Sequence, residues 1–150
     1  MIRNDREERE TRERLEDFRE QVAATRRTLA EQAADAETTE LAVQPLKVLV
    51  AELEFDLALY ERLRQAGVSA VPSYSAEESG KELIALRIAR GWTQRKLAEE
   101  LGVSEAQVSR DERNDYQGIS QERRARILDA LGVEEQRVFR SKRPPARATG

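Results

Sequence analysis

The stretch QRKLAEELGVSEAQVSRDERNDY, from Gln94 to Tyr116, decides how the second half of this chain folds. Thr93 is a good N-cap, and it predicts a helix over 94–101. Ser104 is a second N-cap, and it predicts another helix over about 105–113. Only three residues separate the two predicted helices. So short a connection forces the helix axes to cross steeply.

The residues around this turn predict which side of the second helix is buried. Gly102 supplies the unusual backbone angle of the turn, and the small side chain of Ala98 lets the two helices approach. Val108 then points inward from the second helix. Its outward face would carry small, polar or charged residues, namely Glu105, Ala106, Ser109, Arg110 and Arg113. A helix displayed in this way fits the major groove of B-DNA.

Three more helices are predicted around this pair. One covers about 79–90, and one covers about 121–131 behind the N-cap Ser120. A short last helix covers about 134–140. The sequence therefore predicts five short helices between residues 79 and 140.

The first half of the chain predicts two longer helices. Residues 2 to about 35 contain no proline or glycine and read as one helix, followed by a break at 36–44. A second helix begins at Pro45, which suits a first turn, and ends at Gly67. Together they predict an antiparallel hairpin with too small a core to stand alone. Its apolar seam predicts dimer or partner contacts by Leu15, Phe18, Val22, Leu29, Leu46, Val50, Leu53, Leu57 and Tyr60.

These elements divide the chain into parts. We expect an all-α protein with a helical hairpin over 1–66, a linker over 67–78, a five-helix domain over 79–140 and a disordered basic tail over 141–150. Residues 1–78 carry 11 basic and 18 acidic side chains, whereas the rest of the chain carries 15 and 11. This asymmetry points to a basic functional end.

The composition excludes several kinds of protein. The chain has no cysteine and no histidine, which excludes disulfides, zinc-finger spacings and histidine-based catalysis. It also lacks a glycine-rich phosphate loop, so we expect no enzyme, no cofactor and no metal. No stretch approaches about 18 apolar residues, and the charged N-terminus is no secretory signal. We therefore expect a cytoplasmic protein without a membrane segment.

Residues 79–140 resemble the Cro/Xre-type helix-turn-helix domain of phage repressors and bacterial regulators. The matching residues are LRIARGWTQRKLAEELGVSEAQVSRDER, followed by ISQERRARILDALGV. The resemblance implies sequence-specific binding to double-stranded DNA. It also implies a repressor that binds a palindromic operator as a homodimer, because one domain contacts only half a site.

The resemblance assigns roles to individual positions. Gln94 corresponds to a glutamine that contacts a backbone phosphate. Arg110 is the best candidate for a bidentate guanine contact, although a phosphate clamp or a pairing with Glu112 would also fit. Phosphate candidates are Arg113, Arg95 and Lys96, although a solvated surface would also explain the last two. The backbone N–H groups of Gly118, Ile119 and Ser120 could hold phosphates as well. The positions at which the family reads bases are Ser104, Glu105, Ala106 and Arg110.

Two acids stand beside these arginines. The family usually pairs an acid at position 112 with an arginine late in the first helix, which implies an ion pair between Arg87 and Glu112. Asp111 departs from the family, which favours an apolar or aromatic residue there. Either Asp111 meets Arg123 or Arg124, or it lowers the affinity for non-specific DNA.

The acidic hairpin leaves two functions open. It could form the contact between the two chains of a dimeric repressor. An extra helical segment before such a domain also resembles the layout of HigA-type antitoxins, which neutralise a toxin nuclease and regulate their own operon. In that case a toxin protein would be the partner of the hairpin.

Overall fold

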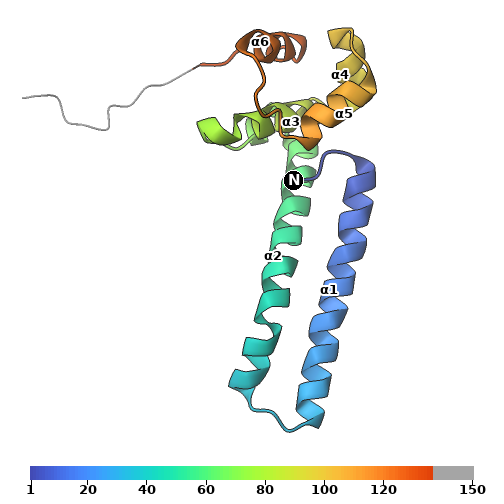
Figure 1. Ribbon diagram of the computed structural model, residues 1–150, viewed down its shortest axis with the longest axis vertical. Helices are drawn as coiled ribbons and strands as arrows, with labels where there is room; N and C mark the ends of the chain where they lie inside the picture. Colours follow the sequence, from blue (N-terminus) through green and yellow to red (C-terminus); the bar gives the residue numbers. More distant parts are fainter. Residues whose placement is uncertain (137–150) are drawn as a thin grey trace, which may run out of the picture.

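The computed structural model describes residues 1–136, and the secondary structure of this part is helical. In Figure 1 the two long helices form a hairpin that stands against one side of a smaller domain. The all-α fold with an N-terminal hairpin and a helical second domain is as expected. The helices are α1 (Asp5–Glu31), α2 (Ala36–Ala66), α3 (Ser79–Ala89), α4 (Gln94–Leu101), α5 (Glu105–Arg113) and α6 (Gln121–Ala130).

The loop of the hairpin is shorter than predicted. The break expected at 36–44 is wrong, because α2 already begins at Ala36. Asp35 is its N-cap, and the Asp35 carboxylate accepts a hydrogen bond from the Thr38 amide at 2.7 Å. Pro45 lies inside the helix instead of in its first turn. It occupies the exposed side of α2, where water can hydrate the carbonyl that proline leaves without a donor.

The predicted apolar seam lies largely between the two helices of the hairpin. Leu15, Leu57 and Tyr60 are buried in the core, and Val50 and Leu53 pack against that core. The remaining seam residues are half-buried, namely Phe18, Val22, Leu29 and Leu46. These side chains therefore pack within one chain, and only a small part of their surface remains exposed for contact with another protein.

The helices α4 and α5 begin and end at the residues predicted from the sequence. Thr93 caps α4 by accepting the Lys96 amide, and Gly102 ends α4 in the left-handed region with φ of 67°. Ala98 and Val108 are buried at the crossing. Residues 102–104 therefore join α4 to α5 in a short turn, as the sequence predicted.

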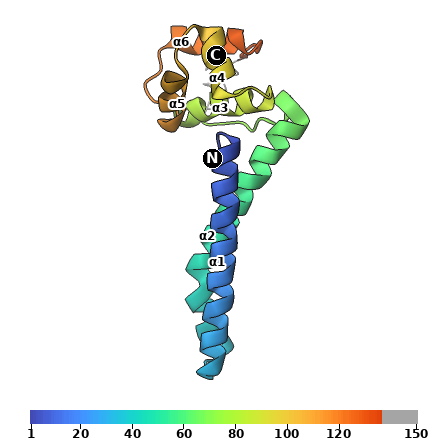
Figure 2. The same ribbon diagram turned by 90° about the vertical axis from the view of Figure 1, so that its right-hand side faces the viewer.

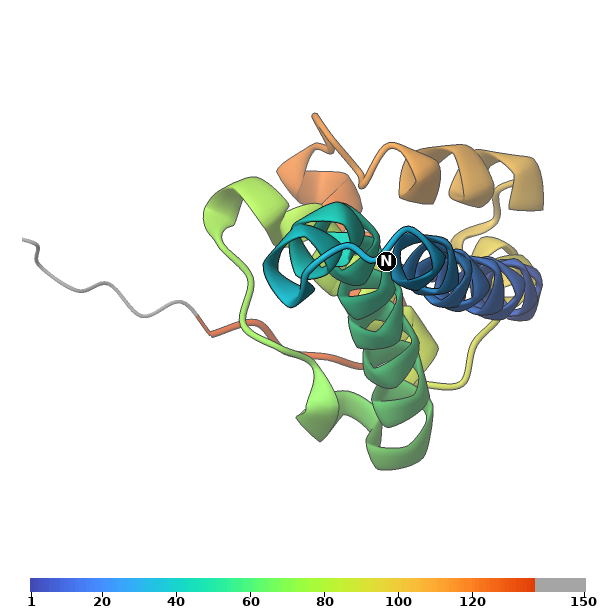
Figure 3. The same ribbon diagram turned by 90° about the horizontal axis from the view of Figure 1, so that it is seen from below.

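One core joins the hairpin to the smaller domain. Residues 67–78, expected as a linker, hold two short 3-10 turns, η1 (Gly67–Ala70) and η2 (Ala76–Glu78). Val68 and Tyr74 from this segment pack against the same core that contains Leu63 of α2. Figures 2 and 3 show the end of α2 entering the domain beside α3. The hairpin thus supplies part of the core on which the domain rests.

Two predictions concern the last residues of the chain, namely a short helix over 134–140 and a tail over 141–150. Residues 134–136 are not helical, and the rest of the helix predicted over 134–140 lies outside the described residues. The tail predicted over 141–150 lies outside them as well. Among the described residues no helix combines the length and apolarity needed to cross a membrane.

Candidate nucleic-acid interface

The outward face of α5 is open to solvent. Ser104 caps the helix by accepting the Gln107 amide at 3.2 Å, which fixes its N-terminus. Val108 and Glu112 on the opposite side are 0% exposed. Ser109 is half-buried, and the other predicted contact residues are exposed, namely Ser104, Glu105, Ala106, Arg110 and Arg113. The structure therefore places the predicted base-reading positions on one accessible side of one helix.

The charged residues near this face have only weak partners. Arg110 donates to the Gln107 amide oxygen at 2.9 Å, three residues earlier on the same helix. It does not pair with Glu112, which was one of its open alternatives. Arg95 donates to Glu99 at 3.0 Å in an exposed pair within α4. Exposed contacts of this kind contribute little, so both guanidinium groups can exchange them for phosphate or base contacts.

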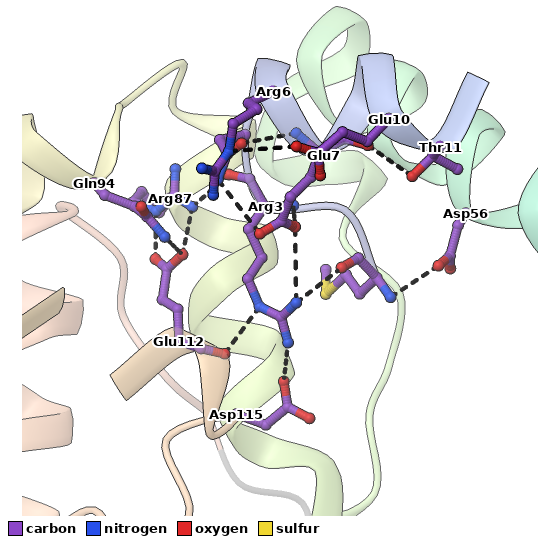
Figure 4. Close-up of polar contacts among 12 residues, drawn as sticks. Arg3, Arg6, Glu7, Glu10, Thr11, Asp56, Arg87, Gln94, Glu112 and Asp115 are labelled. Carbon is purple, nitrogen blue, oxygen red and sulfur yellow. Dashed lines mark hydrogen bonds and ion pairs between the residues drawn. The ribbon is translucent and has the colours of Figure 1, made fainter. Parts of the chain in front are cut away.

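A buried ion pair fixes α5 against α3. Arg87 Nη2 donates to Glu112 Oε2 at 2.7 Å, and Arg87 Nε donates to Glu112 Oε1. The two side chains are 2% and 0% exposed. Arg87 Nη1 also donates to the Trp92 carbonyl at 2.7 Å. The pair that the resemblance implies thus lies inward, which leaves the outward face of α5 free of this acid (Figure 4).

Gln94 joins this buried pair. Its side-chain amide donates to Glu112 Oε2 at 2.8 Å, and the residue is half-buried at the start of α4. An amide nitrogen carries two hydrogens, so the second can still meet an acceptor outside the protein. The expected phosphate contact and the observed contact with Glu112 are therefore compatible.

The N-terminus of the chain reaches the same cluster. Arg3 Nε donates to the Glu112 carbonyl at 2.9 Å, and Arg3 Nη2 meets Asp115 at 3.0 Å. Arg87 Nη2 in turn donates to the Arg3 carbonyl at 2.9 Å. Figure 4 shows Arg3 lying between these groups. Sequence reasoning missed Arg3, because nothing local to it signals a partner more than a hundred residues away.

A cleft separates the start of α1 from the predicted reading surface. It has a volume of about 790 Å³, and Arg3 and Arg6 line one side of it. Gln94, Glu105 and Ser109 line the other side. Tyr60 and Asp5 line the cleft as well. Tyr60 donates to Asp5 at 2.9 Å, and burial together with this hydrogen bond raises the pKa of Tyr60 to about 12. The start of α1 therefore borders the surface that would face nucleic acid.

Asp111 binds α6. Its carboxylate forms an ion pair with Arg123 and accepts a hydrogen bond from the Gln107 amide at 2.8 Å. Arg124, the other possible partner, instead pairs with Glu82 and Glu135. Ser120 caps α6 by accepting the Arg123 amide at 3.1 Å. Of the two roles predicted for Asp111, the structure therefore shows the contact with α6, and the partner is Arg123.

We expect Asp111→Ala and Arg123→Ala each to lower the free energy of unfolding by about 1 kcal/mol or less, because both side chains remain partly exposed. Urea unfolding of both single variants and the double variant measures their coupling. A coupled pair makes the double variant less destabilised than the sum of the singles. Purely additive losses would show that the contact contributes nothing.

The charge of the domain is almost balanced where the structure describes it. Residues 79–136 carry 10 basic and 11 acidic side chains, whereas 137–150 carry five basic ones and no acid. The basic excess of the second half thus belongs entirely to its last 14 residues. Affinity for DNA from the described part must come from the placement of individual arginines instead of from net charge.

A comparison with protein families supports the resemblance. A family model described as helix-turn-helix matches residues 83–138, which begin within α3 and include α4, α5 and α6. No curated protein and no solved structure matches the chain. The match includes the short turn that joins α4 and α5. Residues 83–138 are a helix-turn-helix domain of the Cro/Xre type, the domain of DNA-binding transcription regulators.

Proposed function

We propose that this protein binds a specific double-stranded DNA sequence by laying α5 in the major groove. The observation that carries the proposal is the division of α5 into two faces. Val108 and Glu112 are buried against the domain, while Ser104, Glu105 and Arg110 stand exposed. An exposed helix face that a short turn fixes against its own domain suits the dimensions of that groove.

Within this proposal the residues divide into two roles. Arg110 reads a guanine through two hydrogen bonds, and Ser104, Glu105, Ala106 and Ser109 contact neighbouring base edges. Arg95, Arg113 and the second amide hydrogen of Gln94 meet backbone phosphates. The backbone at Ser120, which precedes α6, adds a further phosphate contact.

We further propose that the protein is a cytoplasmic repressor that acts as a homodimer. One chain presents one α5, so a palindromic operator needs two chains with their reading helices about 34 Å apart. Occupation of such a site would block a promoter.

Selection of bound DNA from a random pool tests this function directly. We expect enrichment of one sequence with two-fold symmetry, because two α5 helices would read equivalent half-sites. Recovery of a single asymmetric site would support specific binding but contradict the dimer. A pool without any enriched sequence would refute specific DNA binding.

Arg110→Ala should weaken binding to the selected site by about 1–3 kcal/mol and relax the preference at one base position. Fluorescence anisotropy on the selected site and on its single-base variants measures both effects. Arg95→Ala is the matched control, because a phosphate contact lowers the affinity for all sequences alike. An equal loss on cognate and random DNA would remove Arg110 from the base-reading role.

A further inference from the structure

The first turn of α1 forms one wall of the cleft beside the reading surface. Arg6 lies on this wall. Glu105, Ala106 and Ser109 of α5 line the other side. A helix that lies in the major groove has a sugar-phosphate strand along each of its sides, because the two strands bound the groove. One of these strands would therefore pass through the cleft.

The position of Gln94 indicates which strand this is. Gln94 lines the cleft at the start of α4. Within the proposed function its second amide hydrogen meets a backbone phosphate. The strand that carries this phosphate would therefore have α4 on one side and α1 on the other. The cleft volume of about 790 Å³ is within the roughly 300–1,000 Å³ of clefts that enclose a small ligand, so a short length of backbone fits it.

The start of α1 is held firmly against the domain. Ile2 is 4% exposed and belongs to the common core. Arg3 donates to the Glu112 carbonyl at 2.9 Å and to the Asp115 carboxylate at 3.0 Å. Movement of α1 away from α5 would break these contacts and expose Ile2 to water. DNA that reaches α5 therefore meets this wall in the place where the structure shows it.

Arg6 is the arginine of this wall with the weakest partner. Its side chain is 70% exposed, and its Nε lies 3.8 Å from Glu10 Oε1, which is beyond hydrogen-bond length. The two other arginines on the hairpin side of the cleft, Arg3 and Arg64, each have a carboxylate at 3.0 Å. Figure 4 shows Arg6 on the first turn of α1. Its guanidinium group can therefore turn to a phosphate at little cost.

We propose that Arg6 contacts a backbone phosphate of the strand that runs between α1 and α4, so that the hairpin forms part of the DNA interface. The proposal rests on the proposed function, since α5 has to lie in the major groove. Glu105 also lines the cleft, but within the proposed function it faces a base edge instead of a phosphate. Arg6 supplies a cation beside a domain whose described residues carry 10 basic and 11 acidic side chains.

The salt dependence of DNA binding tests this contact. Loss of one phosphate contact reduces the slope of log K against the logarithm of the salt concentration by about 0.9. Over the range from about 1 M to about 0.1 M salt, this difference makes Arg6→Ala bind about eightfold more weakly than the parent chain. Fluorescence anisotropy at several salt concentrations measures both values on the selected site and on random DNA. Arg6 is exposed, so circular dichroism should show the fold unchanged.

Arg27→Ala is the matched control. Arg27 is an exposed arginine of α1 that also pairs with a glutamate of its own helix, Glu20, at 2.7 Å. It lies near the far end of α1, about 30 Å along the helix from Arg6. We expect its loss to leave the affinity and the salt slope unchanged. If Arg6→Ala matches Arg27→Ala, or binds DNA more tightly than the parent chain, the inference is wrong.

A DNA-cleaving probe provides a second measurement, because the chain has no cysteine of its own. Glu10→Cys places a single thiol one helical turn from Arg6 and keeps that arginine. An iron chelate attached to this thiol should cleave the bound DNA at the strand beside the half-site. The same chelate on Arg27→Cys should leave that strand intact. Bound DNA that the chelate at position 10 does not cleave there would contradict the contact.

The results separate this inference from the proposed function. If the chain binds its selected site and Arg6→Ala binds equally well, the inference fails and the proposed function stands. If the chain binds all sequences alike and Arg6→Ala weakens this binding, the contact by Arg6 stands and the sequence-specific function fails. A chain that binds no DNA refutes both.

Discussion

Replacement of Arg87 by methionine is expected to lower the free energy of unfolding by about 3–5 kcal/mol. Methionine retains much of the side-chain volume but removes the cation that faces Glu112. That carboxylate is 0% exposed, so water cannot replace the lost partner. The Gln94 amide would remain as its neighbour at 2.8 Å, but one neutral donor does not offset a buried charge.

Urea unfolding followed by circular dichroism measures this loss. Arg95→Met is the matched control, since it removes an arginine from an exposed pair with Glu99 and should cost less than about 1 kcal/mol. Arg87→Met/Glu112→Met should regain much of the stability, because two apolar side chains leave no buried charge. If Arg87→Met costs no more than Arg95→Met, the pair does not stabilise the domain.

The crossing of α4 and α5 could be predicted because its signals are local. Thr93, Gly102 and Ser104 lie within a few residues of the helix ends they determine, and each acts through its own backbone or cap. The two faces of α5 follow from its periodicity in the same way. The partner of Glu112 came from the family resemblance, since no local pattern connects it to Arg87.

The parts that sequence did not predict depend on long-range contacts or on competition between local signals. Asp35 and Pro45 both suit the start of a helix, and the cap at Asp35 prevailed because a proline on an exposed side is tolerated. Arg3 reaches Glu112 only once the hairpin docks. The apolar positions of α2 predicted that the helix needs partners, but they could not tell α1 from a second copy.

The contact between α3 and the loop after α5 depends on the absence of a side chain at Gly80. A Cβ atom built there would lie 1.7 Å from the Asp115 carbonyl oxygen. The loop has little freedom to retreat, because Asp115 and Tyr116 already have φ of 47° and 50°. Tyr116 is also buried in the core, which fixes this end of the loop.

Gly80→Ala is therefore expected to lower the free energy of unfolding by about 3 kcal/mol or more, which is the upper end of the loss at an overpacked site.

Gly118→Ala is the matched control in the same loop. A Cβ atom there meets nothing within 4 Å, although φ is 71°. Only backbone strain of about 1–2 kcal/mol should result. Thermal and urea unfolding compare the two variants. Because Asp115 lies two residues beyond the end of α5 and pairs with Arg3, Gly80→Ala should also weaken binding to the selected DNA. Equal stability of the two variants would show that the loop yields to the methyl group.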